Sequence, residues 1–254
     1  AGGILEQLIN AKINHLYNAE GDLVMARFHF ALKQWWMRWL KEQEVFVADK
    51  SKSAVEKFKK KLRWKDDESW FDCGGIGIVI YAICSNEVKV VEELLRELKE
   101  KYEGTEYTRR LESCTRDEGY ITLGIPGQTT TLFAAMAWGS PDIVSMLLAY
   151  GANTNSIDVM GNDAFMYASV YGRVENIVRW IQDVKNVDLE KCNSVLGATS
   201  IFAAVNMGSN KFAAVSVLLK QGARVDAMTH AGFSVLMAAC ANEDADPKVV
   251  KEIL

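Results

Sequence analysis

The chain has 254 residues, a formal net charge of −4 at pH 7 and a charged fraction of 24%. This composition is ordinary for a globular protein, and the negative balance argues against a general nucleic-acid binder, so no specific nucleic acid is expected as a partner. No apolar run approaches the roughly 18 residues that a membrane span requires. The five cysteines are scattered and form no C-x-x-C pair, which favours an intracellular, reducing compartment such as the cytoplasm.

The first 71 residues carry helical patterns that differ from those of the rest of the chain. Apolar residues at spacings of three and four predict helices over residues 4–19 and 23–44. Ser53 and Glu56 form a capping box for a third helix, from residue 54 to about residue 64. We expect residues 1–71 to be a helical region, either a cap on the following repeats or degenerate repeats. The start without Met and the end inside a predicted helix suggest a piece of a longer polypeptide.

The third predicted helix is strongly basic between Lys57 and Lys65, where six of nine residues are lysine or arginine. One interpretation is a secondary contact with an acidic partner or an anionic membrane surface. The other is an ordinary solvated face, because Val55, Phe58 and Leu62 form an apolar stripe at helical spacing and leave the cations on the opposite side.

The central stretch of the chain predicts two short helices joined by a tight break. Thr130 is placed to cap a helix over residues 131–138, and Gly139 is expected to end that helix in the left-handed conformation. Ser140 is expected to cap the second helix, with Pro141 at the first position, where a missing N–H does no harm. Neither helix can bury its apolar face alone, so the unit requires neighbours on both sides.

The letters of this stretch resemble the ankyrin repeat. Residues 130–135 read Thr-Thr-Leu-Phe-Ala-Ala in the place of the family signature T-P-L-H-x-A, and Gly-Ala-Asn-Thr-Asn closes the unit at residues 151–155. The same slot begins again at Asp163, 33 residues after Thr130, which is the ankyrin period. The resemblance implies an all-α fold, an ankyrin-repeat solenoid of helix-turn-helix units with an N-terminal helical region.

This register divides residues 72–254 into about five repeats, starting near residues 72, 125, 158, 194 and 229, with the last repeat truncated. The first two repeats are separated by more than one period. We therefore expect a charged insertion at about residues 99–119, which should project as a polar loop or a short helix.

The residue types that carry catalysis, or that bind metals and cofactors, form no usual pattern. The three histidines lie far apart in the chain, and none is in H-E-x-x-H spacing. The glycine cluster at residues 73–77 lacks the lysine of a P-loop, and no G-x-S-x-G occurs. We predict no catalytic, cofactor-binding or metal-binding residue.

The resemblance implies that a partner binds in a groove formed by the fingers, which are the loops between repeats, and by the exposed side of the first helix of each repeat. Carried over by position, the expected partner-binding residues are Trp138, Tyr171, Val170, Met207, Asn206, Met160, Asn162, His230 and Phe233, with Val159, Val195 and Leu196 also in the fingers. Aromatic and Met side chains there are typical of binding hot spots. The alternative for each residue is packing against the next repeat.

Trp138 and Tyr171 are the expected anchors of this groove. They occupy the same repeat position 33 residues apart, so stacking should place them side by side, about 10 Å apart at the spacing of packed helices.

Three functions are compatible with these observations. The preferred one is a non-catalytic protein–protein interaction module or scaffold that holds a partner in its groove. The alternative is the regulatory or assembly portion of a larger enzyme, channel or membrane-associated complex. An enzyme within this chain is disfavoured, because no nucleophile–base pair or metal constellation is found.

Overall fold

The structure is a computed structural model that describes residues 53–62, 78–112, 129–207, 210–241 and 246–254. Within these ranges the chain forms α-helices and no strand, which confirms the prediction of an all-α fold. The helices are α3 (Ala54–Leu62), α4 (Ile78–Cys84), α5 (Val88–Lys101), α6 (Gly104–Leu111), α7 (Thr131–Trp138), α8 (Pro141–Ala149), α9 (Ala164–Val170), α10 (Val174–Asp183), α11 (Ser200–Met207), α12 (Lys211–Lys220), α13 (Val235–Ala241) and α14 (Pro247–Ile253). The helices predicted over residues 4–19 and 23–44 lie outside the described residues.

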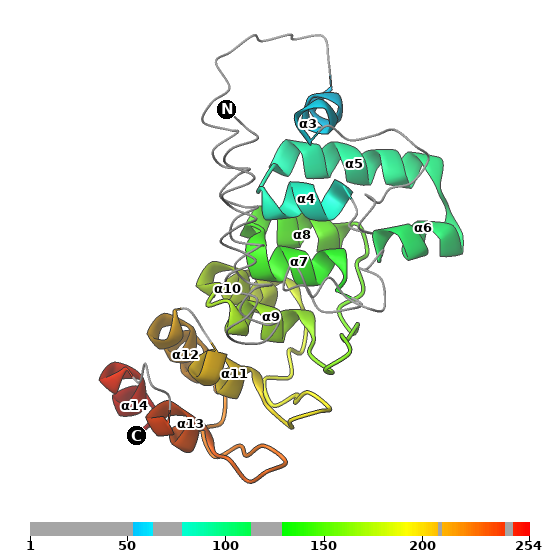
Figure 1. Cartoon of the computed structure of the whole chain (residues 1–254). Coiled ribbons are helices and arrows are strands. Elements are labelled where there is room, and N and C mark those ends of the chain that lie inside the picture. The colour runs from blue at the N-terminus through cyan, green and yellow to red at the C-terminus, as the bar shows by residue number, and fades with distance from the viewer. Residues whose placement is uncertain (1–52, 63–77, 113–128, 208–209, 242–245) are drawn as a thin grey trace, which may run out of the picture.

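Ten of these helices form five successive pairs, from α4–α5 to α13–α14 (Figure 1). The first helix of each pair contacts the first helix of the next pair, and α5, α8, α10, α12 and α14 form a second row beside them. We call α4, α7, α9, α11 and α13 the inner helices, and the second row the outer helices. The predicted solenoid of helix-turn-helix units is confirmed.

The core runs along the stack between the two rows of helices. In α7, every residue from Thr131 to Ala137 is buried, because this helix is covered by α4 on one side, α9 on the other and α8 behind. A helix that is apolar all round is stable only when it is enclosed in this way. Outer helices such as α10 instead bury one face, which includes Ile177 and Trp180, and expose a charged one.

Two of the predicted helix starts are confirmed by their capping bonds. The Thr130 hydroxyl accepts a hydrogen bond from the Phe133 N–H at 3.3 Å, and the Ser53 hydroxyl accepts one from the Glu56 N–H at 3.1 Å. The apolar stripe of α3 is also real, since Val55 and Phe58 are buried and α3 packs on α5.

Two predictions for the break after α7 are wrong, namely the left-handed conformation of Gly139 and the cap at Ser140. Gly139 has φ −74° and ψ 175°, which is extended backbone, and Ser140 makes no capping hydrogen bond with its side chain. The left-handed conformation does occur at the equivalent breaks, at Asn86 and Gly172. At those two breaks, the residue after the left-handed one donates its N–H to a carbonyl of the preceding inner helix. At Gly139 the backbone is extended instead, and the Gly139 carbonyl faces the following repeat. It accepts from Arg173 Nη2 at 2.7 Å and Asn176 Nδ2 at 3.1 Å.

The described part of the expected insertion packs on the stack. Helix α6 buries Leu111, and the Tyr107 hydroxyl donates to the Tyr150 carbonyl at the end of α8 at 2.6 Å. The Thr131 hydroxyl donates to the Leu111 carbonyl at 2.7 Å. These contacts hold α6 against the second helix pair, so this part does not project, because its aromatic and apolar side chains provide a docking face.

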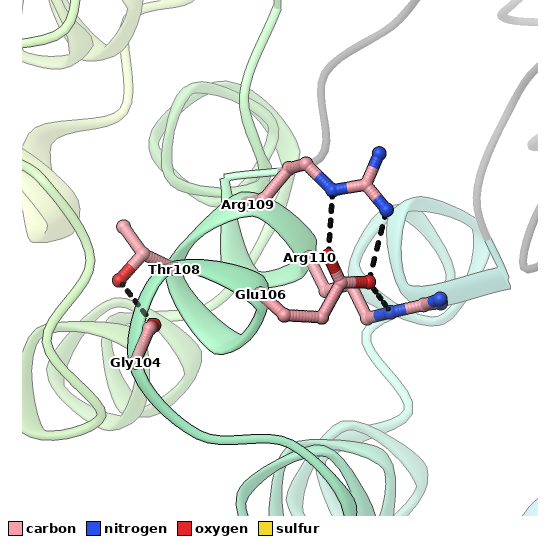
Figure 2. Close-up of polar contacts among 5 residues, drawn as sticks. All are labelled: Gly104, Glu106, Thr108, Arg109 and Arg110. Carbon is pink, nitrogen blue, oxygen red and sulfur yellow. Dashed lines mark hydrogen bonds and ion pairs between the residues drawn. The ribbon is translucent and has the colours of Figure 1, made fainter.

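The one carboxylate of α6, on Glu106, pairs with two guanidinium groups, those of Arg109 and Arg110 (Figure 2). Arg109 donates from Nε and Nη2 to the two carboxylate oxygens of Glu106, each at 2.9 Å, and Arg110 donates from Nε at 2.6 Å. The Arg110 guanidinium also lies 4.1 Å from the centre of the Tyr102 ring. Hydrogen bonds from Arg109 and then Arg110 lower the pKa of Glu106 to about 2.

We expect the Glu106 carboxyl to titrate near pH 2, roughly two pH units below an ordinary glutamate. A carboxyl whose pKa is depressed in the folded state contributes to stability above its unfolded pKa, and that contribution is lost as the pH falls toward 2. Carbon-13 NMR of the side-chain carboxyl measures the midpoint directly. Arg109→Gln should raise it, and a midpoint near 4.3 in the wild type would show that the two guanidinium contacts do not persist in solution.

Candidate functional site

The candidate site is built on the fingers that precede α9, α11 and α13, which all extend toward the same side of the stack in Figure 1. We call residues 157–162, 192–197 and 227–233 the three finger tips. Single antiparallel bridges join Cys192 to Thr199 and Met228 to Ser234 at the bases of the second and third fingers. Each tip is therefore a tight hairpin-like turn that leads directly into an inner helix.

The first tip is held by the buried carboxylate of Asp158. One of its oxygens accepts from the N–H groups of Met160 and Asn162, each at 2.8 Å. The other accepts from Asn162 Nδ2 at 3.0 Å and from the Tyr167 hydroxyl at 2.9 Å. Burial, and then the charge of Asp158, raise the pKa of Tyr167 well above its usual range. Tyr167 therefore stays a neutral donor at physiological pH, and Asp158 keeps no free oxygen for a ligand.

The second and third tips are closed in an analogous way. Asn193 accepts through Oδ1 from the N–H groups of Leu196 and Ala198, and donates through Nδ2 to Asn162 Oδ1 at 2.9 Å. In the third tip the Thr229 hydroxyl accepts from the Phe233 N–H at 3.1 Å. The first residues of the turns thus use short polar side chains to organise the backbone, and the Asn193 bond ties the second tip to the first.

The second and third tips also touch each other directly. The His230 N–H donates to the Leu196 carbonyl at 2.8 Å, and the imidazole lies against Gly197, where a Cβ would come within 2.4 Å of His230 Cδ2. Gly197 has φ +68°, so the turn needs glycine for both its conformation and its close approach. The three tips form one connected row.

Apolar side chains are exposed along this row. Met160 is 40% exposed, Leu196 49% and Phe233 43%. The exposed large apolar side chains of the three tips are Ile157, Val159, Met160, Val195, Leu196, Met228 and Phe233, and Met237 on α13 is exposed as well. Such a concentration is unusual on a protein without a partner.

Trp138 and Tyr171 lie side by side, as their repeat positions require. Their ring centroids are 5.1 Å apart in an edge-to-face arrangement, which is closer than the helix spacing because the two side chains reach toward each other. Tyr171 also stacks on Tyr167 at 6.3 Å. Both predicted anchors are half-buried and pack against the core, so each one contributes to the stack and presents only part of its surface.

The structure separates the other predicted site residues into two groups. Met160, His230 and Phe233 are exposed at the tips, and Asn206 is exposed near the end of α11. Val170 is half-buried, and Asn162 is half-buried within the hydrogen bonds of the tips. The side chain of Met207 lies outside the described part of the chain.

Ile157, Met228 and Met237 are exposed apolar residues that were not among the predicted site residues. Ile157 and Met228 lie one residue before Asp158 and Thr229, which close the turns of their tips. The sequence signal that identifies these two residues is an apolar side chain in a loop made mostly of polar turn residues.

In the residues that the structure describes, no helix is long and apolar enough to cross a membrane. The same residues hold no cluster of three or more His, Cys, Asp or Glu side chains that suits a metal ion.

The basic helix is described only in part. Lys57 and Lys60 are exposed on the side of α3 opposite the buried Val55 and Phe58. Lys59 is half-buried. The side chains of Lys61, Arg63 and Lys65 lie outside the described part of the chain. A contact of this helix with an acidic partner or an anionic membrane remains a prediction.

Comparison with known proteins agrees with the geometry of the stack. The family model of the ankyrin repeat matches residues 127–159, which include α7 and α8. The chain contains an ankyrin repeat. Over 114 residues it is 32% identical to the phosphocholine transferase AnkX of Legionella pneumophila, and over 126 residues it is 29% identical to the ankyrin repeat domain-containing protein SAT10 of Stachybotrys chartarum.

These similarities cover part of each protein. They include 44% and 46% of this ankyrin-repeat chain, but only 12% of AnkX and 6% of SAT10. The chain therefore spans a small fraction of the length of these relatives. Ankyrin repeats are units of protein interaction, and the match indicates a protein-interaction module.

Proposed function

We propose that this ankyrin stack is a non-catalytic module that binds a protein partner through the row of finger tips and the adjoining inner helices. The observation that carries the proposal is the distribution of exposed apolar surface. In the described residues, seven of the eleven exposed large apolar side chains lie in the three finger tips. Among the described residues, the exposed large apolar side chains of the outer helices are Val178 and Phe212.

The organisation of the tips supports the same function. Their turns are closed by Asp158, Asn193 and Thr229, so the exposed side chains are presented by backbone that is already ordered. A preorganised surface loses less conformational entropy on binding than a flexible loop does, and more of the contact energy then appears as affinity.

A second candidate is that the stack is the regulatory or assembly portion of a larger enzyme or complex. The observation that favours it is that the similarity covers only 12% of AnkX, a relative that is named as a transferase. In this case the stack would still bind a protein surface, and catalysis would belong to another part of the polypeptide or complex.

We expect the combined variant Trp138→Ala/Tyr171→Ala to bind an identified partner at least tenfold more weakly, because truncating a central aromatic anchor costs about 2 kcal/mol or more. The partner is first isolated by crosslinking, and its dissociation constant is then measured by calorimetry. Because the two rings also pack on the core, the exposed pair Met160→Ala/Phe233→Ala serves as a second test that leaves the stack intact.

The matched control is Lys57→Glu/Lys60→Glu, which reverses exposed charges on α3 and should leave the affinity unchanged. Loss of binding in this variant alone would place the interface on α3 and contradict the proposal. Thermal melts of all the variants separate a change in binding from a change in folding.

A further inference from the structure

Resting on this proposed function, we infer that the partner contributes an uncharged, apolar segment, and that the three finger tips are its principal contact. The inference comes from the distribution of charge over the stack, which differs sharply between its two rows of helices. The proposed function leaves the chemistry of the partner open, and this inference specifies it.

The inner helices carry no charged residue. The sequences of α4, α7, α9, α11 and α13 contain no Asp, Glu, Lys or Arg. The outer helices contrast with them: α5 has eight such residues in fourteen, and α10 has three in ten. The charged side chains of the helix pairs are therefore concentrated on the outer helices, and the inner helices themselves are uncharged.

The finger tips continue this neutral surface. Asp158 is their one acidic or basic residue apart from His230, and it is 4% exposed with both oxygens occupied by hydrogen bonds. The nearest charges in the loop before the third tip, on Arg224 and Asp226, pair with each other at 2.8 Å. Lys191, just before the second tip, pairs with Asp163 at 3.0 Å. A charged partner group at the tips would lose its hydration and would find the nearby opposite charges already paired, which is unfavourable.

The exposed side chains fit an apolar occupant. Met160, Met228 and Met237 have flexible, polarisable thioethers that adapt to an irregular apolar surface. Neighbouring repeats are separated by about 10 Å, so three tips span about 20 Å. That length corresponds to an extended segment of about six residues or a helix of about thirteen. A lipid surface is the less suitable occupant, because the tips lack the Lys and Arg side chains that anchor interfacial segments to headgroups.

The test uses random 16-residue peptides displayed on phage, selected against the full 254-residue chain. We expect the enriched peptides to be uncharged and apolar over at least six residues. Their dissociation constants should change less than twofold between 50 and 500 mM NaCl, since no charge is paired in the complex. Leu196→Lys/Phe233→Lys should weaken binding at least tenfold. Val178→Lys/Phe212→Lys makes the same change on outer helices, at side chains that are 37% and 38% exposed, and should have no effect.

Four outcomes would overturn the inference, and they separate it from the proposed function. Enriched peptides that are charged and salt-sensitive, but still lost in the tip variant, would refute the apolar class while leaving the binding face in place. Enriched peptides whose binding is unchanged by variants at the tips and at Trp138 and Tyr171 would refute both the inference and the proposed function. A selection that enriches no peptide would also refute both. Sedimentation of the wild type with neutral phosphatidylcholine vesicles, abolished by Leu196→Lys/Phe233→Lys, would assign the tips to lipid.

Discussion

Asn176→Asp is expected to destabilise the stack by about 3 kcal/mol at pH 7, the lower end of the range for a broken buried pair. The Arg173 guanidinium, which donates to the same Gly139 carbonyl, compensates the new charge only in part. Asn176 is completely buried, and its Nδ2 lies 3.1 Å from each of the carbonyl oxygens of Ala135, Met136 and Gly139. A carboxylate of the same shape would direct a negative oxygen at three acceptors at the junction between two repeats.

The loss of stability in Asn176→Asp should depend on pH. Burial among acceptors raises the folded-state pKa of the introduced carboxyl above its unfolded value of about 3.9. A group with a raised folded pKa is best tolerated below its unfolded pKa, and stability is lost as the pH rises through the folded pKa. The variant should therefore approach the wild type near pH 4 and fall furthest behind near pH 7.

Urea denaturation of both proteins at pH 4 and pH 7 measures this difference. Asn155→Asp is the matched control, because Asn155 is exposed and the same change there buries no charge. Equal stability of Asn176→Asp and the wild type at pH 7 would mean that Asn176 does not donate to the preceding repeat.

Gly139→Val is expected to lower the free energy of unfolding by about 3 kcal/mol, the upper part of the range for overpacking. The reason is steric, since this residue has an extended backbone. A Cβ at Gly139 would lie 2.9 Å from the Ala135 carbonyl oxygen, 3.0 Å from Ala135 Cα and 3.3 Å from Ile83 Cγ2. Backbone atoms of α7 cannot move aside without changing how α7 packs on α4.

The measurement is the melting temperature and the urea midpoint of a graded series. Gly139→Ala should lie between the wild type and Gly139→Val, because valine adds two further carbons to the same clash. Ala149→Val introduces the same side chain at an exposed position of α8 and should cost about 0.5 kcal/mol. If Gly139→Val melts with the wild type, the close approach of Gly139 to α7 and Ile83 is incorrect.

The sequence by itself determined the local elements of this protein. The start of α7 follows from the cap at Thr130, and the start of α8 follows from Pro141. These signals are reliable because they act between residues no more than four positions apart, where the backbone geometry of one turn decides the outcome. The 33-residue recurrence from Thr130 to Asp163 extended the same reasoning to a stack, and it placed Trp138 beside Tyr171.

Only the tertiary structure decided the features that depend on contacts across repeats. The conformation of Gly139 is set by Arg173 and Asn176 of the next helix pair, whereas a local rule for glycine predicted the wrong backbone. Asn162 and Met160 both lie in a predicted finger, yet Asn162 is half-buried and accepts a hydrogen bond from Asn193 of the next finger, whereas Met160 is exposed. Exposure at the tips depends on how each finger rests on its neighbour, and the energies of those contacts are not encoded within one repeat.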